Sequence, residues 1–254
     1  MAIIKRIVIV SLVAVLALGD SMSILAQNRP RTRTNPTRAI VIVVGGVGGW
    51  DPLPACSQIA FRRAGLEHEV REFVWTHGFG QWLKDLQDIR YLVCKADELA
   101  QEIRRLYDED PDRPIYLVAK SGCTGLALMA AERLPARTIR RIVLLSAAVS
   151  ADYDLRSALR ATQHEIVSFY SPHDSLVLDW GTRQFGTIDR VYTSSAGLRG
   201  FQIPSDFNEG DRELYNRLVQ VRWSPRMIRE GYMGGHAATS FPTFLRIEVV
   251  PWLD

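Results

Sequence analysis

Three side chains of this 254-residue chain have types and positions suited to nucleophilic catalysis: a serine, an aspartate and a histidine. Ser121 stands at the centre of the stretch Ala119–Cys123, just after the apolar run Ile115–Ala119. Small residues two positions before and after a serine permit a sharp strand-to-helix turn that exposes its hydroxyl. A helix that follows directs its N-terminus at the serine and favours developing negative charge. The spacing predicts that Ser121 is a nucleophile.

Cys123 is a competing nucleophile, because Ser121 to Gly125 also fits a small-x-Cys-x-Gly pattern. That pattern places the turn two residues farther from the end of the strand, so Ser121 is preferred. A strand-to-helix turn with a purely structural role is the alternative for the whole motif.

A candidate acid and a candidate base occur later in the chain. Asp174 follows the apolar run Glu165–Tyr170, where a triad needs the carboxylate that orients its histidine. The alternative for Asp174 is a solvated or turn-capping aspartate. His236 ends the glycine-rich stretch Gly231–His236, a position that packing of an amphipathic helix does not explain. The lesser candidates are Asp152, Asp154 and Asp179 for the acid and His77 for the base, and His77 precedes the serine in the chain.

Alternating strands and helices must position these residues. Strands that alternate with helices imply right-handed crossovers and an α/β fold, with a mostly parallel sheet and helices on both faces. Such sheets carry their functional residues at the carboxyl ends of the strands. We expect strands at 39–44, 68–75, 115–119, 142–146, 165–170 and 226–232, and helices around 92–106, 125–134 and 241–252.

The chain order Ser, Asp, His, with each residue in a loop after a strand, resembles that of the α/β-hydrolase superfamily. The resemblance spans about 39–254, which we expect to be a single domain. It implies Ser121 as nucleophile, His236 as general base and then acid, and Asp174 as the carboxylate that holds the imidazole in its working tautomer.

The resemblance also implies an oxyanion hole. Its donors would be the backbone N–H of Gly122, after the nucleophile, and that of Val47, in the first glycine loop. Here Gly45-Gly46 replaces the His-Gly that usually follows the first strand, so the second donor is defined only to within one residue.

The function that the resemblance implies is a serine esterase or lipase-like hydrolase. It would cleave an ester or related acyl bond of a small molecule through an acyl-enzyme, without a metal or an organic cofactor. The alternative is a non-catalytic binding protein on the same fold, because one fold hosts many functions.

The glycine loop 45–49 also suggests a dinucleotide-binding oxidoreductase. A G-x-G-x-x-G fingerprint that starts at Gly46 requires glycine at position 51, where Asp51 stands. No Walker lysine follows the loop, so the sequence argues against phosphate binding.

The 61 residues between Asp174 and His236 exceed what one loop, helix and strand need. We expect an insertion at 175–222 that caps or rims the acyl pocket, with Phe185 and Phe201 lining it. The alternative is a packed surface excursion whose aromatic side chains complete the core.

The N-terminus has the pattern of a secretory signal peptide over 1–26. Lys5-Arg6 precedes an apolar run of 13 residues, Ile7–Gly19, which is shorter than the roughly 20 residues of a bilayer span. Cleavage would follow Gly19 or Ala26, and 27–38 would be a flexible basic leader. We therefore expect an exported protein that contacts a membrane only if this segment stays attached.

Charge and cysteine content argue against nucleic-acid binding and against a cysteine-based metal site. Beyond the leader, 25 basic side chains face 27 acidic ones, so the composition gives no nucleic-acid footprint. The three cysteines show no metal-ligand spacing. We expect no metal site, and three buried thiols or at most one disulfide.

Overall fold

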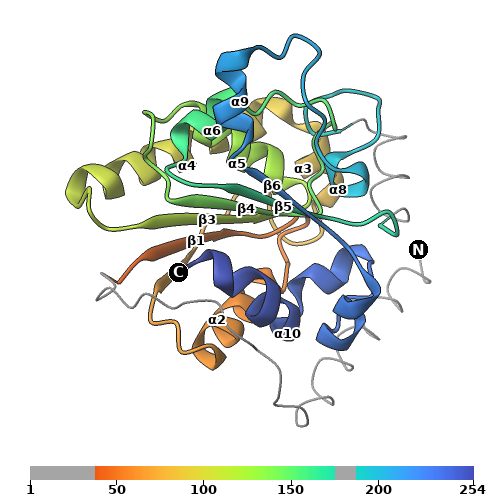
Figure 1. The fold of residues 1–254 in the computed structure, drawn as a ribbon. Helices are drawn as coiled ribbons and strands as arrows, with labels where there is room; N and C mark the ends of the chain where they lie inside the picture. The colour runs from red at the N-terminus through yellow and green to blue at the C-terminus, as the bar shows by residue number, and fades with distance from the viewer. Residues whose placement is uncertain (1–37, 175–186) are drawn as a thin grey trace. The chain divides into compact units, whose positions relative to one another are not determined.

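The computed structural model describes residues 38–174 and 187–254 of the chain. Within these residues, six strands form one sheet in the order β2-β1-β3-β4-β5-β6, and every neighbouring pair is parallel (Figure 1). The predicted α/β class is therefore confirmed. The strands are β1 (Ile40–Val44), β2 (Glu69–Glu72), β3 (Ile115–Lys120), β4 (Arg141–Leu145), β5 (Ile166–Tyr170) and β6 (Leu218–Arg222).

The strand order reverses beside β1. The chain first adds β2 on one side of β1 and then crosses to the other side, where β3 to β6 follow in sequence. In open parallel sheets, ligands bind outside the carboxyl ends of the strands at such a reversal. The loops that follow β1 and β3 therefore lie at the expected location of a site.

The central strands are apolar because both of their faces are covered. All five residues of β1 are buried, and their side chains alternate between two hydrophobic clusters. Ile40, Ile42 and Val44 belong to the cluster that includes buried residues of α4 and α5. Val41 and Val43 belong to the cluster on the opposite face.

Helices cover both faces of the sheet (Figure 1). The longest, α4 (Ile89–Glu109), buries the predicted stripe of apolar residues, and the Asp88 carboxylate accepts a hydrogen bond from the Tyr91 amide at its start. With α4 on one face lie α3 (Trp82–Gln87), α5 (Cys123–Glu132), α6 (Arg156–Ala161), α8 (Ala196–Arg199) and α9 (Glu209–Tyr215). On the other lie α2 (Leu53–Arg63), α10 (Pro242–Phe244) and the short turns η2 (Pro225–Glu230), η3 (His236–Ser240), η4 (Leu245–Val249) and η5 (Val250–Trp252).

The predicted strand at 226–232 is wrong. Residues Pro225–Glu230 form the 3-10 turn η2, which Gly231 ends with a φ of +85°. Proline at the start lacks the N–H that a central strand needs, and glycine tolerates the left-handed conformation. The sixth strand is β6 instead, inside the range 175–222 that was expected to be an insertion.

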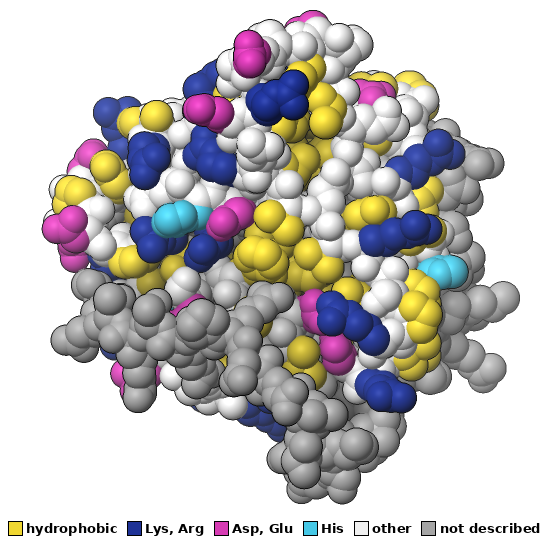
Figure 2. All heavy atoms as spheres, in the orientation of Figure 1, with side chains coloured by type: hydrophobic (Ala, Val, Ile, Leu, Met, Phe, Trp, Pro, Cys, Tyr) yellow, Lys and Arg dark blue, Asp and Glu magenta, His cyan; other side chains and the backbone are white. Residues whose placement is uncertain are grey.

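The predicted signal peptide (1–26) and nearly all of the leader (27–38) lie outside the described residues. Among the described residues, no helix is both long and apolar enough to cross a membrane. On the face drawn in Figure 2, basic and acidic side chains are interspersed among hydrophobic ones.

The carboxyl group of Glu230 at the end of η2, beside that of Glu248 in η4, predicts a pH-dependent stability. Burial and the neighbouring carboxylate of Glu248 raise the pKa of Glu230 to about 7. Because the folded state then binds this proton more tightly than the unfolded chain does, stability falls as pH rises from the ordinary glutamate pKa toward 7. We expect Glu230→Gln to raise Tm at about pH 8 and to change it little at about pH 4.

Calorimetric melting at the two pH values checks this expectation. The control is Glu213→Gln, which changes an exposed glutamate on α9. An equal rise in Tm at both pH values for Glu230→Gln would contradict the proposed origin of the effect.

Candidate active site

Ser121 lies in the turn that joins β3 to α5. Its φ is +60°, a value that is uncommon for a non-glycine residue and marks local strain. The Ser121 amide donates to the carbonyl of Leu145, at the end of β4, at 2.9 Å. The Ser121 carbonyl accepts hydrogen bonds from the amide and the hydroxyl of Thr124, at 3.0 and 2.6 Å. These bonds hold the turn, so the hydroxyl of Ser121 is presented at the carboxyl end of the sheet.

Gly122 allows the first glycine loop to approach this turn. A Cβ atom at Gly122 would lie 2.9 Å from Cγ1 of Val47, closer than real Cβ atoms come. A Cβ atom at Gly46 would lie 3.7 Å from Cβ of Ser121. The loop after β1 therefore packs directly against the turn that carries Ser121.

The structure brings the three predicted residues together in one hydrogen-bonded chain. His236 is the first residue of η3, and its Nε2 lies 2.8 Å from Oγ of Ser121. Its Nδ1 lies 2.9 and 3.1 Å from the two carboxylate oxygens of Asp174. The histidine ring thus links the hydroxyl to the carboxylate, although the three residues are far apart in the sequence.

Asp174 is almost fully buried, with 1% of its surface exposed. It lies just beyond the end of β5, and its amide donates to the Ser171 carbonyl at 3.1 Å. A buried carboxylate requires hydrogen-bond partners, and His236 supplies one. Burial and the charge of Asp174 raise the pKa of the nearby Tyr232, so this phenol stays neutral.

Gly234 lets the histidine loop lie against the aspartate loop. Its φ is +85°, and an added Cβ would lie 3.1 Å from Cβ of His173 and from Oγ of Ser171. The indole N–H of Trp223 donates to the Tyr232 carbonyl at 2.9 Å and anchors the same loop. This contact explains Gly234, one of the glycines before His236 that the sequence singled out.

The rival residues lie in other environments. Cys123 is fully buried, its thiol donates to the carbonyls of Val44 and Lys120, and burial raises its pKa. Nδ1 of His77 lies 2.9 Å from the Asp85 carboxylate. Asp154 pairs with Arg156, Asp152 is exposed, and Asp179 lies outside the described residues.

Three hydrophobic side chains converge beside Ser121. An added Cβ on Gly122 would lie within 4 Å of Val47, of Ile188 (3.6 Å) and of Leu86 (3.8 Å). Ile188 belongs to the range 175–222, so part of that segment borders the candidate site. Leu86 and Ile188 have no local signature in the sequence, because only the tertiary fold brings α3 and the segment after 187 to the start of α5.

Of the two residues expected to line a pocket, Phe185 lies outside the described residues. Phe201 is buried in the hydrophobic core, and its amide and carbonyl are hydrogen-bonded to the side chain of Gln220. A pocket role for Phe201 stays a prediction, and its burial favours the alternative of core packing.

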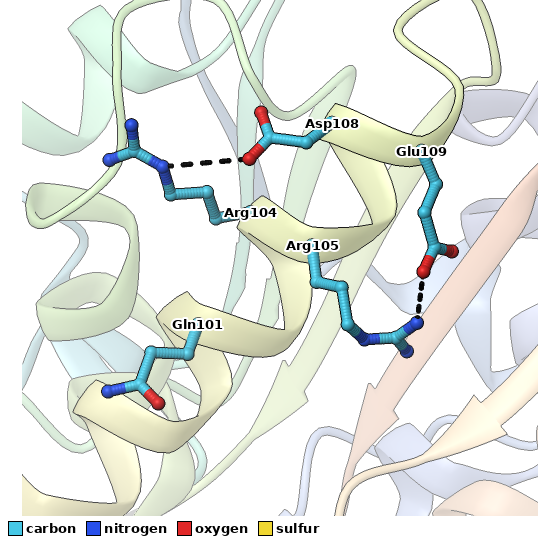
Figure 3. A pocket seen from close by; sticks show the side chains of 5 residues that line it. All are labelled: Gln101, Arg104, Arg105, Asp108 and Glu109. Carbon is cyan, nitrogen blue, oxygen red and sulfur yellow. Dashed lines mark hydrogen bonds and ion pairs between the residues drawn. The ribbon is translucent and has the colours of Figure 1, made fainter.

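Two surface hollows of the described residues lie away from Ser121, Asp174 and His236. One of about 430 Å³ lies on the exposed side of α4, where Arg104 pairs with Asp108 at 3.8 Å and Arg105 with Glu109 at 2.5 Å (Figure 3). Another of about 700 Å³ lies between the end of α2 and the start of β2. The two ion pairs on α4 are ordinary for a solvated helix face. Within the described residues, no cluster of three or more histidine, cysteine or acidic side chains could hold a metal ion.

Comparison with known proteins finds similar solved structures. No protein-family model matches the chain, and no curated protein matches it. The chain is similar to esterase PE8, with a TM-score of 0.47 and 16% identity over 83% of this chain and 93% of that chain. It is similar to a protein described as a hydrolase of the alpha/beta superfamily from Xanthomonas campestris pv. campestris, with a TM-score of 0.43 and 16% identity over 82% and 99% of the two chains. It is also similar to a cutinase-like protein from Cryptococcus sp., with a TM-score of 0.40 and 10% identity over 86% and 95%.

The three thiols differ in accessibility. Cys56, Cys94 and Cys123 are free, and Cys94 is exposed, so the prediction of three buried thiols is wrong for Cys94. We expect iodoacetamide to alkylate Cys94 in the folded protein and to spare Cys123, because burial removes both access and thiolate character. Peptide mass spectrometry after alkylation with and without urea measures this. Alkylation of Cys123 in the folded protein would restore it as a candidate nucleophile.

Proposed function

We propose that the protein is a serine hydrolase of the α/β-hydrolase type that cleaves an ester or related acyl bond of a small molecule. The observation that supports this most strongly is the hydrogen-bonded chain from Ser121 through His236 to Asp174. A nucleophile within hydrogen-bond reach of a base, which is itself oriented by a third group, is the arrangement that nucleophilic catalysis requires.

In the first half of the reaction, Oγ of Ser121 attacks the carbonyl carbon of the substrate. Nε2 of His236 accepts the hydroxyl proton and then delivers it to the leaving alcohol or amine. Asp174 keeps the Nδ1 proton of His236 in place and stabilises the imidazolium that forms. In the second half, water attacks the carbonyl carbon of the acyl-enzyme while Nε2 of His236 accepts its proton. The bond from that carbon to Oγ of Ser121 then breaks, His236 returns the proton to Oγ, and the acid is released.

The oxyanion of each tetrahedral intermediate would be bound by the backbone N–H groups of Gly122 and Val47. Two features support this assignment. Gly122 immediately follows the nucleophile and precedes α5, whose N-terminus favours negative charge. Val47 contacts Gly122 from the loop after β1.

Removal of the Ser121 hydroxyl tests the function directly. We expect Ser121→Ala to lower hydrolysis of a p-nitrophenyl ester by about 10⁶-fold, because the acyl-enzyme route is lost. A fluorophosphonate probe should label the wild-type protein at Ser121 and should not label the variant.

Ser146→Ala is the matched control. Ser146 also has a positive φ (+51°) after the neighbouring strand β4, but its side chain is fully buried. This control should keep both labelling and hydrolysis. A wild-type protein that binds esters without labelling or turnover would favour a non-catalytic binding protein on this fold.

The pocket is tested by comparing Ile188 with Phe201. We expect Ile188→Ala to open space beside Gly122 and to shift the ratio of kcat/KM between octanoyl and acetyl esters by about tenfold toward the longer chain. Phe201→Ala should instead lower Tm strongly, because truncation of a buried aromatic side chain costs about 3–5 kcal/mol. A larger change of chain-length preference in Phe201→Ala than in Ile188→Ala would restore Phe201 as a pocket residue.

A further inference from the structure

Two carboxylates hold the glycine loop after β1, one on each side of Val47: Asp51 is largely shielded from water and Asp85 is buried. The amide of Gly46 donates to Oδ2 of Asp51 at 3.0 Å. The amide of Gly48 donates to Oδ2 of Asp85 at 2.7 Å. The Val47 amide therefore lies between two amides, those of Gly46 and Gly48, that are held by side chains from outside the glycine stretch 45–49.

Asp51 links this loop to the nucleophile turn and to the histidine segment. Its Oδ2 lies 3.2 Å from Nζ of Lys120, the residue before Ser121, and its Oδ1 accepts from the Leu53 amide at 2.8 Å. The same Lys120 ammonium donates to Oγ of Ser240, the last residue of η3, at 2.8 Å. The side chains of Asp51 and Lys120 are 11% and 5% exposed, so the pair is shielded from water.

The charge of Asp51 is compensated where it lies. Burial by itself would raise the pKa of Asp51, but Lys120 and the amides of Leu53 and Gly46 outweigh burial and lower it. The carboxylate therefore remains ionised and accepts several hydrogen bonds at once.

Asp85 holds the other side of the loop from α3. Its side chain is fully buried, and its Oδ1 accepts from the amide of His77 at 2.7 Å. The same oxygen lies 2.9 Å from Nδ1 of His77, whose ring stacks on Tyr91. Asp85 thus joins the loops after β1 and β2, and the amide of Gly80 adds a bond to the Gly48 carbonyl at 2.9 Å.

Val47 lies between the amides that Asp51 and Asp85 hold, and it contacts Gly122, the other proposed donor of the oxyanion hole. Its side chain packs against Gly122, and its amide makes no hydrogen bond with another described residue. Oxyanion donors are effective when their positions are fixed before the reaction, since no reorganisation is then needed. An error of about 1 Å in such a position costs about 100-fold in rate.

We infer that Asp51 and Asp85 are positioning residues that hold the Val47 amide in register with Gly122 for the oxyanion. The inference rests on the proposed serine-hydrolase function. Neither carboxylate contacts the reacting hydroxyl, and each acts through the backbone of the loop. A loop with four glycines within 45–49 has little stiffness of its own, which explains why side chains from elsewhere fix it.

The test compares Asp51→Asn and Asp85→Asn with Asp211→Asn. Asp211 is the matched control, because it is also buried, accepts an amide hydrogen bond (Asn208, 3.1 Å) and pairs with an arginine (Arg156, 3.0 Å), but it caps α9. Each variant is titrated with a fluorophosphonate probe, so that kcat for a p-nitrophenyl ester is expressed per reactive serine. The affinity for a trifluoromethyl ketone, which forms a tetrahedral oxyanion on the serine, is the second readout.

In both site variants we expect kcat per reactive serine to fall about 10- to 100-fold, with KM changed less than about threefold, because only transition-state binding is lost. Affinity for the trifluoromethyl ketone should fall in parallel with kcat. Asp211→Asn should lower Tm without changing either quantity. If Asp51→Asn does not fold because Lys120 loses its counter-ion, Asp51→Asn combined with Lys120→Met removes both charges and is measured in the same way.

Two outcomes overturn the inference. Unchanged kcat per reactive serine and unchanged ketone affinity in both site variants, with a wild-type protein that labels at Ser121, would make the two carboxylates purely structural. A wild-type protein that does not label at Ser121 would overturn the proposed function, and the inference with it.

Discussion

The strained turn at Ser121 is the constraint on which the rest of the site depends. A non-glycine residue at φ +60° costs about 1–3 kcal/mol and persists only where its surroundings determine it. Here the bonds to Leu145 and Thr124 fix the turn, and the absence of a side chain at Gly122 admits the loop of Val47. A relaxed turn would move the hydroxyl away from His236, which lies 2.8 Å from it.

The sheet supplies the remaining geometry. Because its strands are parallel, the loops after β1, β3 and β5 all leave from the same edge. The chain after β6 returns to that edge through η2 and brings His236 to Ser121 and Asp174. Two glycines allow loops to pack closely. Gly122 admits the loop after β1, and Gly234 lets the histidine loop lie against the loop after β5.

Much of this arrangement was predictable, because it has a local signature in the sequence. The apolar residues of β1 and the apolar stripe of α4 predict which side chains are buried. The three triad candidates follow from the motif around Ser121 and from the chain order. The sixth strand was missed because β6 lies at the sheet edge, is only half-buried and lacks a strong apolar run. Asp85 and Ile188 were missed because their contacts are tertiary: Asp85 bonds an amide 37 residues away, and no local pattern records that.

Hydrophobic packing and buried hydrogen bonds have different effects in this molecule: the first stabilises the fold, and the second orients the loops of the candidate site. Hydrophobic contact in the clusters on both sheet faces is non-directional, so it stabilises the fold without setting the direction of any one N–H group. An ion pair shielded from water, such as Asp51–Lys120, is often no more stabilising than a hydrophobic pair of the same size. Its hydrogen bonds are directional, however, and they join the glycine loop, the residue before Ser121 and the end of η3. At the candidate site, polar groups are therefore buried where the relative orientation of three loops matters.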